Sequence, residues 1–291
     1  MSTVIGITLG DAAGVGPQVI RGALESGKLD PDFTYRVLGN AEGVIPGKPT
    51  PESAGRAFAA LEDAARLTRE GALAAVVTGP IHKARIQAAG FKFPGQTEFF
   101  ADRWGARNFA MLLTGGPLTV ALVTAHVPLK DVPRLLREND IVRVGLLLED
   151  FLLLRLGRKA RIAMAGLNPH AGEDGVLGDE EQRIIAPALA RLADHGQRAT
   201  WSTVLSPDTV FHRAAVDGEF DAVLCMYHDQ GLIPLKLIAF DQGVNVTLGL
   251  PFVRTSPDHG TAFDLAAKGG ARPDSMIAAI NLAAELVKKR R

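Results

Sequence analysis

Short apolar runs alternate with longer amphipathic stretches along the chain, and this alternation restricts the possible folds more than any other feature of the sequence. An alternation of strands and helices builds a largely parallel sheet that is covered by helices. Most of the runs place Val, Ile, Leu and Ala at successive positions, as strands buried on both faces do. We therefore predict an α/β fold with strands at 4–8, 34–38, 74–78, 110–114, 119–124, 161–165, 222–226 and 243–248.

Two helices are predicted most clearly between and after these strands. Residues 52–70 show apolar positions at helical spacing, and a last helix begins near Asp274, directly after a proline. The segment 40–51 is rich in Gly and Pro and is predicted to be a surface loop. Open parallel sheets bind ligands at the carboxyl ends of their strands, so the residues that follow the strands are the first candidates for a functional site.

The composition excludes several classes of function. Lys plus Arg and Asp plus Glu both number 32, so the chain lacks the basic excess that is typical of nucleic-acid binders. Its single cysteine, Cys225, allows no intramolecular disulfide and fits a reducing compartment. The most apolar segment, 144–154, contains Glu149 and Asp150 and falls short of the ~20 residues of a membrane span. With no visible signal peptide, we expect a soluble cytoplasmic protein.

Three of the histidines follow predicted strands or lie in tight polar loops. His126 comes after the strand at 119–124, His170 after the strand at 161–165, and His228 after the strand at 222–226. Three imidazoles at three strand ends can converge on one divalent ion and leave a coordination position open for substrate. Spacing alone leaves open the alternative that each is a hydrogen-bonded loop histidine.

A second group of polar residues lies further along the chain. Lys236, Asn245 and Arg254 follow His228 in sequence, and the planar guanidinium of Arg254 is suited to bidentate binding of a phosphate or carboxylate. Lys236 can add a point charge to the same anion. The alternative from residue type alone is that these are solvated surface groups.

The glycine-rich segment 8–17 follows the first strand and opens a predicted helix, which favours close approach of backbone to a ligand. It contains neither the dinucleotide-binding G-x-G-x-x-G order nor the G-x-x-x-x-G-K-[ST] phosphate loop. A nicotinamide cofactor would therefore have to bind without the Rossmann fingerprint.

Several motifs together resemble one family, the 4-hydroxythreonine-4-phosphate dehydrogenases of pyridoxal phosphate synthesis. The resemblance covers nearly the whole chain and is strongest in the segments 226–231 (Met-Tyr-His-Asp-Gln-Gly), 245–256 and 258–262 (Asp-His-Gly-Thr-Ala), with support from 78–80 and 167–173. It implies a two-lobed fold like that of isocitrate and isopropylmalate dehydrogenases, with an interlobe cleft. We expect residues 1–125 and 260–291 to form one lobe and residues 126–259 the other.

The resemblance also assigns roles to residues. It implies that His126, His170 and His228 bind a divalent ion (Zn²⁺, Mg²⁺ or Co²⁺). It implies substrate contacts for Thr97, Gln96, Lys236, Asn245 and Arg254, and catalytic roles for Asp208 and Lys236. It further implies a homodimer with the metal site near the subunit interface.

The implied reaction is the oxidation, by NAD or NADP, of the C3 hydroxyl of 4-phosphooxy-L-threonine. The resulting β-keto acid then loses carbon dioxide to give 3-amino-2-oxopropyl phosphate. A bound metal would stabilise the developing alkoxide, and the nicotinamide would accept the hydride. The sequence does not identify the general base.

The sequence departs from the family pattern at Gln96, where a histidine is usual in a Gly-His-Thr-Glu segment. Glutamine forms hydrogen bonds but does not titrate. Leu9, Ala12 and Gln18 also depart from the family's opening motif. Oxidation of 4-phospho-D-threonate or 4-phospho-D-erythronate is therefore the first alternative. A non-catalytic relative that binds metal and phosphate is the second, and a metal-dependent hydrolase ranks behind both.

Overall fold

The computed structural model describes residues 3–195 and 198–290, which fold into two compact units. Unit 1 comprises the chain up to Arg107 and from Asp241 onward, and unit 2 comprises Asn108–Phe240. The expected lobes had boundaries at 125/126 and 259/260 instead. The difference arises because the strand ending at Leu122 pairs inside unit 2, and the strand beginning at Val244 pairs inside unit 1. Asn245 and Arg254 therefore belong to unit 1.

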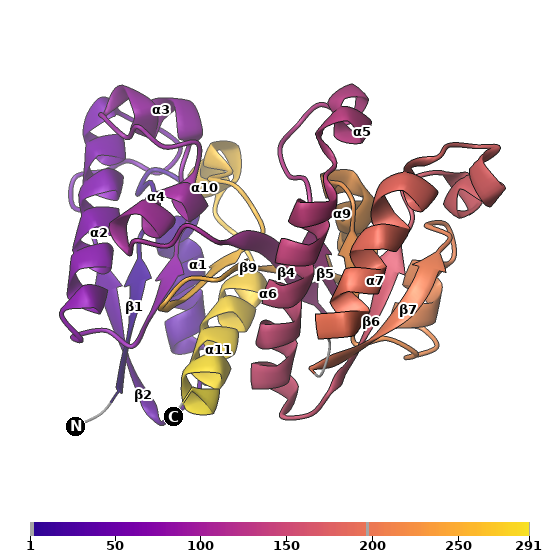
Figure 1. Ribbon diagram of the computed structural model, residues 1–291. Helices are drawn as coiled ribbons and strands as arrows, with labels where there is room; N and C mark the ends of the chain where they lie inside the picture. Colours follow the sequence, from indigo (N-terminus) through magenta and orange to yellow (C-terminus); the bar gives the residue numbers. More distant parts are fainter. Residues whose placement is uncertain (1–2, 196–197, 291) are drawn as a thin grey trace. The chain divides into compact units, whose positions relative to one another are not determined.

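Unit 1 is built on five strands in the order β2-β1-β3-β10-β9 (Figure 1). All neighbours are parallel except β9 and β10, which are antiparallel. The strands are β1 (Thr3–Thr8), β2 (Phe33–Leu38), β3 (Ala75–Thr78), β9 (Val244–Leu248) and β10 (Val253–Pro257). The helices are α1 (Gly16–Glu25), α2 (Pro51–Arg69), α3 (Lys83–Ala88), α4 (Gln96–Arg103), α10 (Phe263–Lys268) and α11 (Asp274–Lys289).

The two helices predicted most clearly from sequence are α2 and α11. Thr50 caps α2 by accepting a hydrogen bond from the Ser53 N–H, and the Ser53 hydroxyl accepts one from the Thr50 N–H in return. Helix α11 packs on β3 and β10 with its apolar face buried, which stabilises the centre of the unit-1 sheet.

Unit 2 is built on five strands in the order β4-β5-β8-β6-β7, parallel except for the β4–β5 hairpin (Figure 1). The strands are β4 (Ala110–Gly115), β5 (Leu118–Leu122), β6 (Ala160–Ala165), β7 (Ala199–Leu205) and β8 (Ala222–Cys225). The helices are α5 (Val132–Leu135), α6 (Glu138–Leu156), α7 (Ala186–His195), α8 (Val210–Ala215) and α9 (His228–Ala239), with 3₁₀ segments η1 (Leu129–Asp131) and η2 (Pro169–Gly175) and a π-helical turn η3 (Glu181–Ile185).

The core of unit 2 explains why Cys225 is no candidate nucleophile. Cys225 is fully buried with apolar side chains of β5, α8 and α9, and this burial raises the pKa of its thiol far above the ordinary value. A Cβ added to Gly231 would lie 3.0 Å from the Cys225 sulfur, so the glycine lets α9 pack closely on the sheet. Over the described residues, no helix is long and apolar enough to cross a membrane.

Candidate active site

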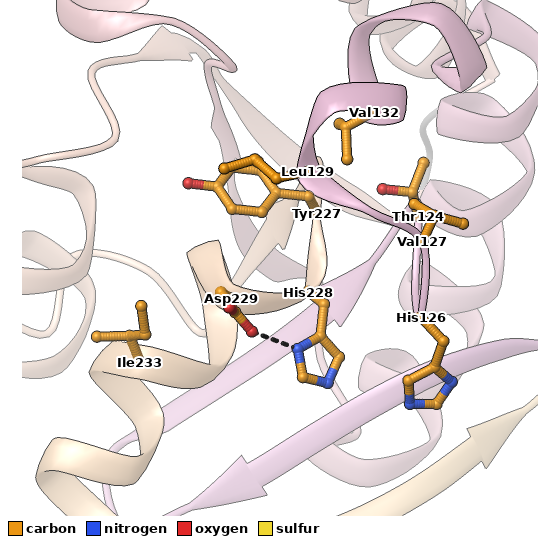
Figure 2. A pocket seen from close by; sticks show the side chains of 9 residues that line it. All are labelled: Thr124, His126, Val127, Leu129, Val132, Tyr227, His228, Asp229 and Ile233. Atoms are coloured by element: carbon orange, nitrogen blue, oxygen red, sulfur yellow. Dashed lines mark hydrogen bonds and ion pairs between the residues drawn. The ribbon is translucent and has the colours of Figure 1, made fainter.

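Two of the three histidines singled out from sequence lie side by side in unit 2. Strands β5 and β8 are parallel neighbours, so the segments that leave their carboxyl ends share one edge of the sheet. His126 follows β5, and His228 is the first residue of α9, after β8. Their ring centroids are 5.4 Å apart and the rings are inclined by 41° (Figure 2).

Backbone and side-chain hydrogen bonds join the two segments that lead to the histidines. The Thr124 hydroxyl donates to the Met226 carbonyl oxygen at 2.7 Å, and the Val123 N–H donates to the Cys225 carbonyl at 2.9 Å. His126 has a left-handed backbone, with φ of 54°, which costs on the order of 1–3 kcal/mol for a non-glycine residue. The chain therefore turns sharply at this histidine, and such strain is common at functional sites.

The spacing of the pair fits a shared metal ion. Two imidazoles that bind one tetrahedral ion at about 2.0–2.1 Å per nitrogen have ring centroids roughly 5 Å apart. Nδ1 of His228 lies 2.6 Å from a carboxylate oxygen of Asp229 (Figure 2). A carboxylate bonded to one ring nitrogen orients the other toward a metal and raises its basicity. Both features suit metal binding at His126 and His228.

These rings open on a cavity of about 290 Å³ at the sheet edge (Figure 2). Its walls are mostly apolar, and the histidines, Asp229 and Tyr227 are its titratable groups. The lining residues are Thr124, His126, Val127, Leu129, Val132, Tyr227, His228, Asp229 and Ile233.

The third predicted ligand, His170, is exposed in segment η2, which follows β6. It does not line the cavity beside His126 and His228. Within the described ranges 3–195 and 198–290, no three His, Cys, Asp or Glu side chains gather closely enough to hold a metal. Of the three histidines predicted to bind a metal, His126 and His228 thus lie together, and His170 lies apart from their cavity.

The Asp208 carboxyl interacts electrostatically with His170. The pKa of its carboxyl is lowered, first by a hydrogen bond from the Ser206 hydroxyl at 2.6 Å and to a lesser extent by His170. Asp208 is therefore a carboxylate at neutral pH. Lys236, the other residue predicted to be catalytic, lies in α9 with its Nζ 5.8 Å from the Phe240 ring centroid.

Gln230 joins the segments that carry His170 and His228, and sequence reasoning did not single it out. It is buried, accepts a hydrogen bond from the Met226 N–H at 2.6 Å, and donates one to the Gly166 carbonyl at 2.6 Å. The signal available in the sequence was its position two residues after His228.

Most of the substrate-binding residues predicted from sequence lie in unit 1, around Arg254. This side chain is only 5% exposed although it is charged. One terminal nitrogen donates to Thr78 Oγ1 at 2.6 Å and to Gln96 Oε1 at 3.0 Å; the other donates to Thr247 Oγ1 at 3.3 Å and to Asn245 Oδ1 at 3.4 Å.

All of these partners of Arg254 are neutral, and no ion pair with it is recorded in the described part of the chain. Burial lowers the pKa of the guanidinium to about 10, against the opposing effect of Glu98, so it keeps its charge at neutral pH. Its Nε is buried without a hydrogen-bond partner among the described residues. A buried cation that is hydrogen-bonded only to neutral groups and has a spare donor is an arrangement that favours anion binding.

Gln96 and Thr97 complete this cluster from the first turn of α4. Gln96 donates to the Gly79 carbonyl at 3.1 Å while its oxygen accepts from Arg254, so it holds the guanidinium without adding charge. The N-cap of α4 is Gly95, and the Thr97 hydroxyl, in the first turn, lies 3.3 Å from that of Thr247. Lys236, the remaining residue predicted to contact the substrate, belongs to unit 2.

Comparison with known proteins agrees with the sequence motifs. The family model of the pyridoxal phosphate biosynthetic protein PdxA matches residues 21–283. A 4-hydroxythreonine-4-phosphate dehydrogenase of Geobacter metallireducens is 43% identical over 324 aligned positions, covering 97% of this chain and 95% of that protein. The crystal structure of 4-hydroxythreonine-4-phosphate dehydrogenase from Klebsiella pneumoniae has a TM-score of 0.83 at 36% identity and covers 98% of this chain and 100% of its own.

The expected fold is also confirmed. An isocitrate dehydrogenase from Methylococcus capsulatus matches 99% of this chain and 85% of its own with a TM-score of 0.55 at 14% identity, which is a likeness of fold alone.

Proposed function

This chain belongs to the family of the pyridoxal phosphate biosynthetic protein PdxA, and we propose that it oxidises 4-hydroxythreonine-4-phosphate with NAD as hydride acceptor. The curated relatives are named 4-hydroxythreonine-4-phosphate dehydrogenases. The observation that carries the proposal is Arg254, a buried guanidinium surrounded by neutral hydrogen-bond partners. A phosphorylated substrate supplies the dianion that such a group lacks.

In this proposal Arg254, with Asn245 and Thr97 beside it, binds the phosphate and fixes the orientation of the substrate. His126, His170 and His228 would hold a divalent ion, with the His228 ring oriented by Asp229. When bound, the ion supplies charge stabilisation at the reacting oxygen, and the nicotinamide accepts the hydride. The C3 hydroxyl then becomes a ketone by loss of a hydride and a proton, and the β-keto acid releases carbon dioxide.

For Asp208 and Lys236 we propose the catalytic roles that the sequence predicts. Asp208 is ionised and lies near His170, so it can stabilise positive charge on that side of the site. Lys236 is carried by the same helix that begins at His228 and can contribute a positive charge to the substrate's anionic groups. The choice between NAD and NADP and the identity of the metal belong to the same proposal.

The function is tested by NADH formation, followed at 340 nm, with purified protein loaded with Zn²⁺, Mg²⁺ or Co²⁺. We expect chelator-sensitive turnover of 4-hydroxythreonine-4-phosphate. Parallel reactions with 4-phospho-D-threonate and 4-phospho-D-erythronate address the first alternative, because activity with those two alone would move the function to sugar-acid oxidation. Absence of turnover of all three substrates, with NAD and with NADP, would contradict the dehydrogenase assignment and favour a non-catalytic relative.

We also propose that the protein is a cytoplasmic homodimer that uses the exposed face of α9. Ile233 is 67% exposed and Leu237 is 85% exposed. Two large aliphatic side chains exposed together on one helix indicate an interaction surface. The helix also begins at His228, a residue of the candidate site. A second copy of the chain is the expected partner. Light scattering should give twice the mass of one chain for the natural sequence and the mass of one chain for Leu237→Glu. The control Leu153→Glu, at an exposed position of α6, should remain dimeric.

A further inference from the structure

The segment that carries His170 has an unusual backbone. His170, Ala171, Gly172, Glu173 and Asp174 have φ values of 52°, 53°, 83°, 42° and 55° in succession. Four of these five residues are not glycine, and each carries a steric cost in the left-handed region. A run of this kind persists only where surrounding contacts impose it. The position of His170 therefore depends on what holds this segment.

Glu181 is the side chain that holds it. The residue is 5% exposed, and one carboxylate oxygen accepts hydrogen bonds from the N–H groups of Leu167 and Asn168, both at 2.7 Å. Its other oxygen accepts from the Asn168 side chain at 2.9 Å. A single buried carboxylate thus fixes the backbone and a side chain at the entry to the left-handed run.

The far part of the segment is fitted to the same carboxylate. A Cβ added to Gly172 would lie 2.8 Å from the second oxygen of Glu181 and 2.7 Å from the Gly178 carbonyl oxygen. The run therefore passes over Glu181 with no room for a side chain at its middle residue. Glu181 itself belongs to the π-helical turn η3, a conformation that is frequent at functional sites.

We propose that Glu181 is the positioning residue of His170: it imposes the left-handed backbone that presents the imidazole, without touching the metal or the substrate. The inference rests on the proposed role of His170 as a metal ligand. No role was assigned to Glu181 from the sequence, because a glutamate eleven residues after a histidine has no fixed spatial relation to it. The relation exists only because η2 returns to the start of η3.

Glutamine cannot replace this carboxylate. Glu181 accepts three N–H donors with two oxygens, and an amide would exchange one oxygen for an NH₂ group that is itself a donor. At least one of these three half-buried donors would then lose its acceptor. The neighbouring Glu180 offers a matched control, because it accepts a single bond from the Asn168 side chain, at 2.7 Å, and none from the backbone of the segment.

The test compares the natural protein with Glu181→Gln, Glu180→Gln and His170→Ala by two measurements. The first is the affinity for Zn²⁺, obtained by competition with a chromogenic chelator. The second is hydrogen exchange, without metal, of the Leu167 and Asn168 amides and of the Leu177 amide, which donates to the Gly172 carbonyl oxygen at 3.0 Å. We expect Glu181→Gln to weaken Zn²⁺ binding by roughly 10–100-fold, the usual effect of losing a group that orients a ligand, and to accelerate exchange. Glu180→Gln should change neither by more than about twofold.

His170→Ala separates failure of this inference from failure of the proposed function. Unchanged Zn²⁺ affinity in His170→Ala would remove the ligand assignment on which the inference rests. Weakened binding in His170→Ala together with natural affinity in Glu181→Gln would overturn the positioning role, whether or not exchange is faster. If Glu181→Gln does not fold, Asn168→Ala removes only the side-chain donor, and it should weaken Zn²⁺ binding by a smaller factor; no change in that variant would also overturn the role.

Discussion

Replacing His228 or His126 by alanine is expected to lower kcat/KM for 4-hydroxythreonine-4-phosphate by roughly 10²–10⁴-fold. A metal ion contributes several kcal/mol of charge stabilisation to a reacting oxygen, and each 1.36 kcal/mol corresponds to tenfold in rate. Each histidine supplies half of the closely spaced pair, so the loss of either leaves the ion with one ring of that pair besides the proposed ligand His170. Initial rates of NADH formation and metal content by mass spectrometry should fall together.

The control for this prediction is His212→Ala. His212 lies in α8 of the same unit, with its Nδ1 3.2 Å from an Asp217 oxygen and most of its side chain exposed. Its removal should leave both rate and metal content unchanged. Asp229→Asn, which keeps an acceptor for His228 but removes the charge, should cost about 10–100-fold. Natural metal content in both His126→Ala and His228→Ala would refute a metal site at this pair.

Much of the fold could be predicted from sequence because buried parallel strands have a strong local pattern. All eight predicted strands are present, with ends that differ by at most two residues. The two missed strands lack the pattern for physical reasons. Strand β7 is an edge strand with mostly half-exposed residues, and β10 carries Arg254 and ends in Pro257. Their identity as strands is set by neighbours in the sheet and not by their own composition.

The site was predictable where sheet topology alone determines it. His126 and His228 meet because β5 and β8 are adjacent and parallel, which is what strand-end residues in such a fold are expected to do. His170 follows β6, which also pairs with β8, yet the path of the chain after β6 is decided by Glu181 and not by the sheet. Sequence patterns do not contain long-range contacts of that kind.

In the cluster around Arg254, too, some contacts follow from the sheet and others depend on long-range folding. Asn245 and Arg254 lie on the antiparallel neighbours β9 and β10, so their proximity follows from one pairing of strands. Thr78 and Gln96 come from segments more than 150 residues away in sequence, and only the folded structure brings them to the guanidinium. The departure from the family pattern at Gln96 thereby gains a physical meaning. The glutamine is a neutral acceptor that orients Arg254 without adding a negative charge beside it.

Gln96→Glu is therefore expected to raise KM for 4-hydroxythreonine-4-phosphate by about 100-fold with little change in kcat. A carboxylate oxygen in place of Gln96 Oε1 would lie 3.0 Å from the Arg254 guanidinium and form a buried ion pair with it. That ion pair would neutralise the Arg254 guanidinium, which otherwise binds the phosphate. The new carboxylate would also repel the phosphate. A loss of binding that is equal in the ground state and the transition state raises KM and leaves kcat unchanged. Steady-state kinetics with varied substrate measures it directly.

Gln87→Glu is the matched control, since it makes the same substitution in α3 of unit 1, where the Gln87 side-chain amide donates a hydrogen bond to the Phe93 carbonyl oxygen at 3.4 Å. It should leave KM within about twofold of the natural value. Gln96→His, the residue usual in the family, tests the neutrality of the position in another way. Because an imidazole titrates near pH 6.5, KM in this variant should vary with pH between about 5.5 and 7.5, and it should vary less in the natural protein. If Gln96→Glu binds substrate as well as the natural protein does, Arg254 cannot be the group that receives the phosphate.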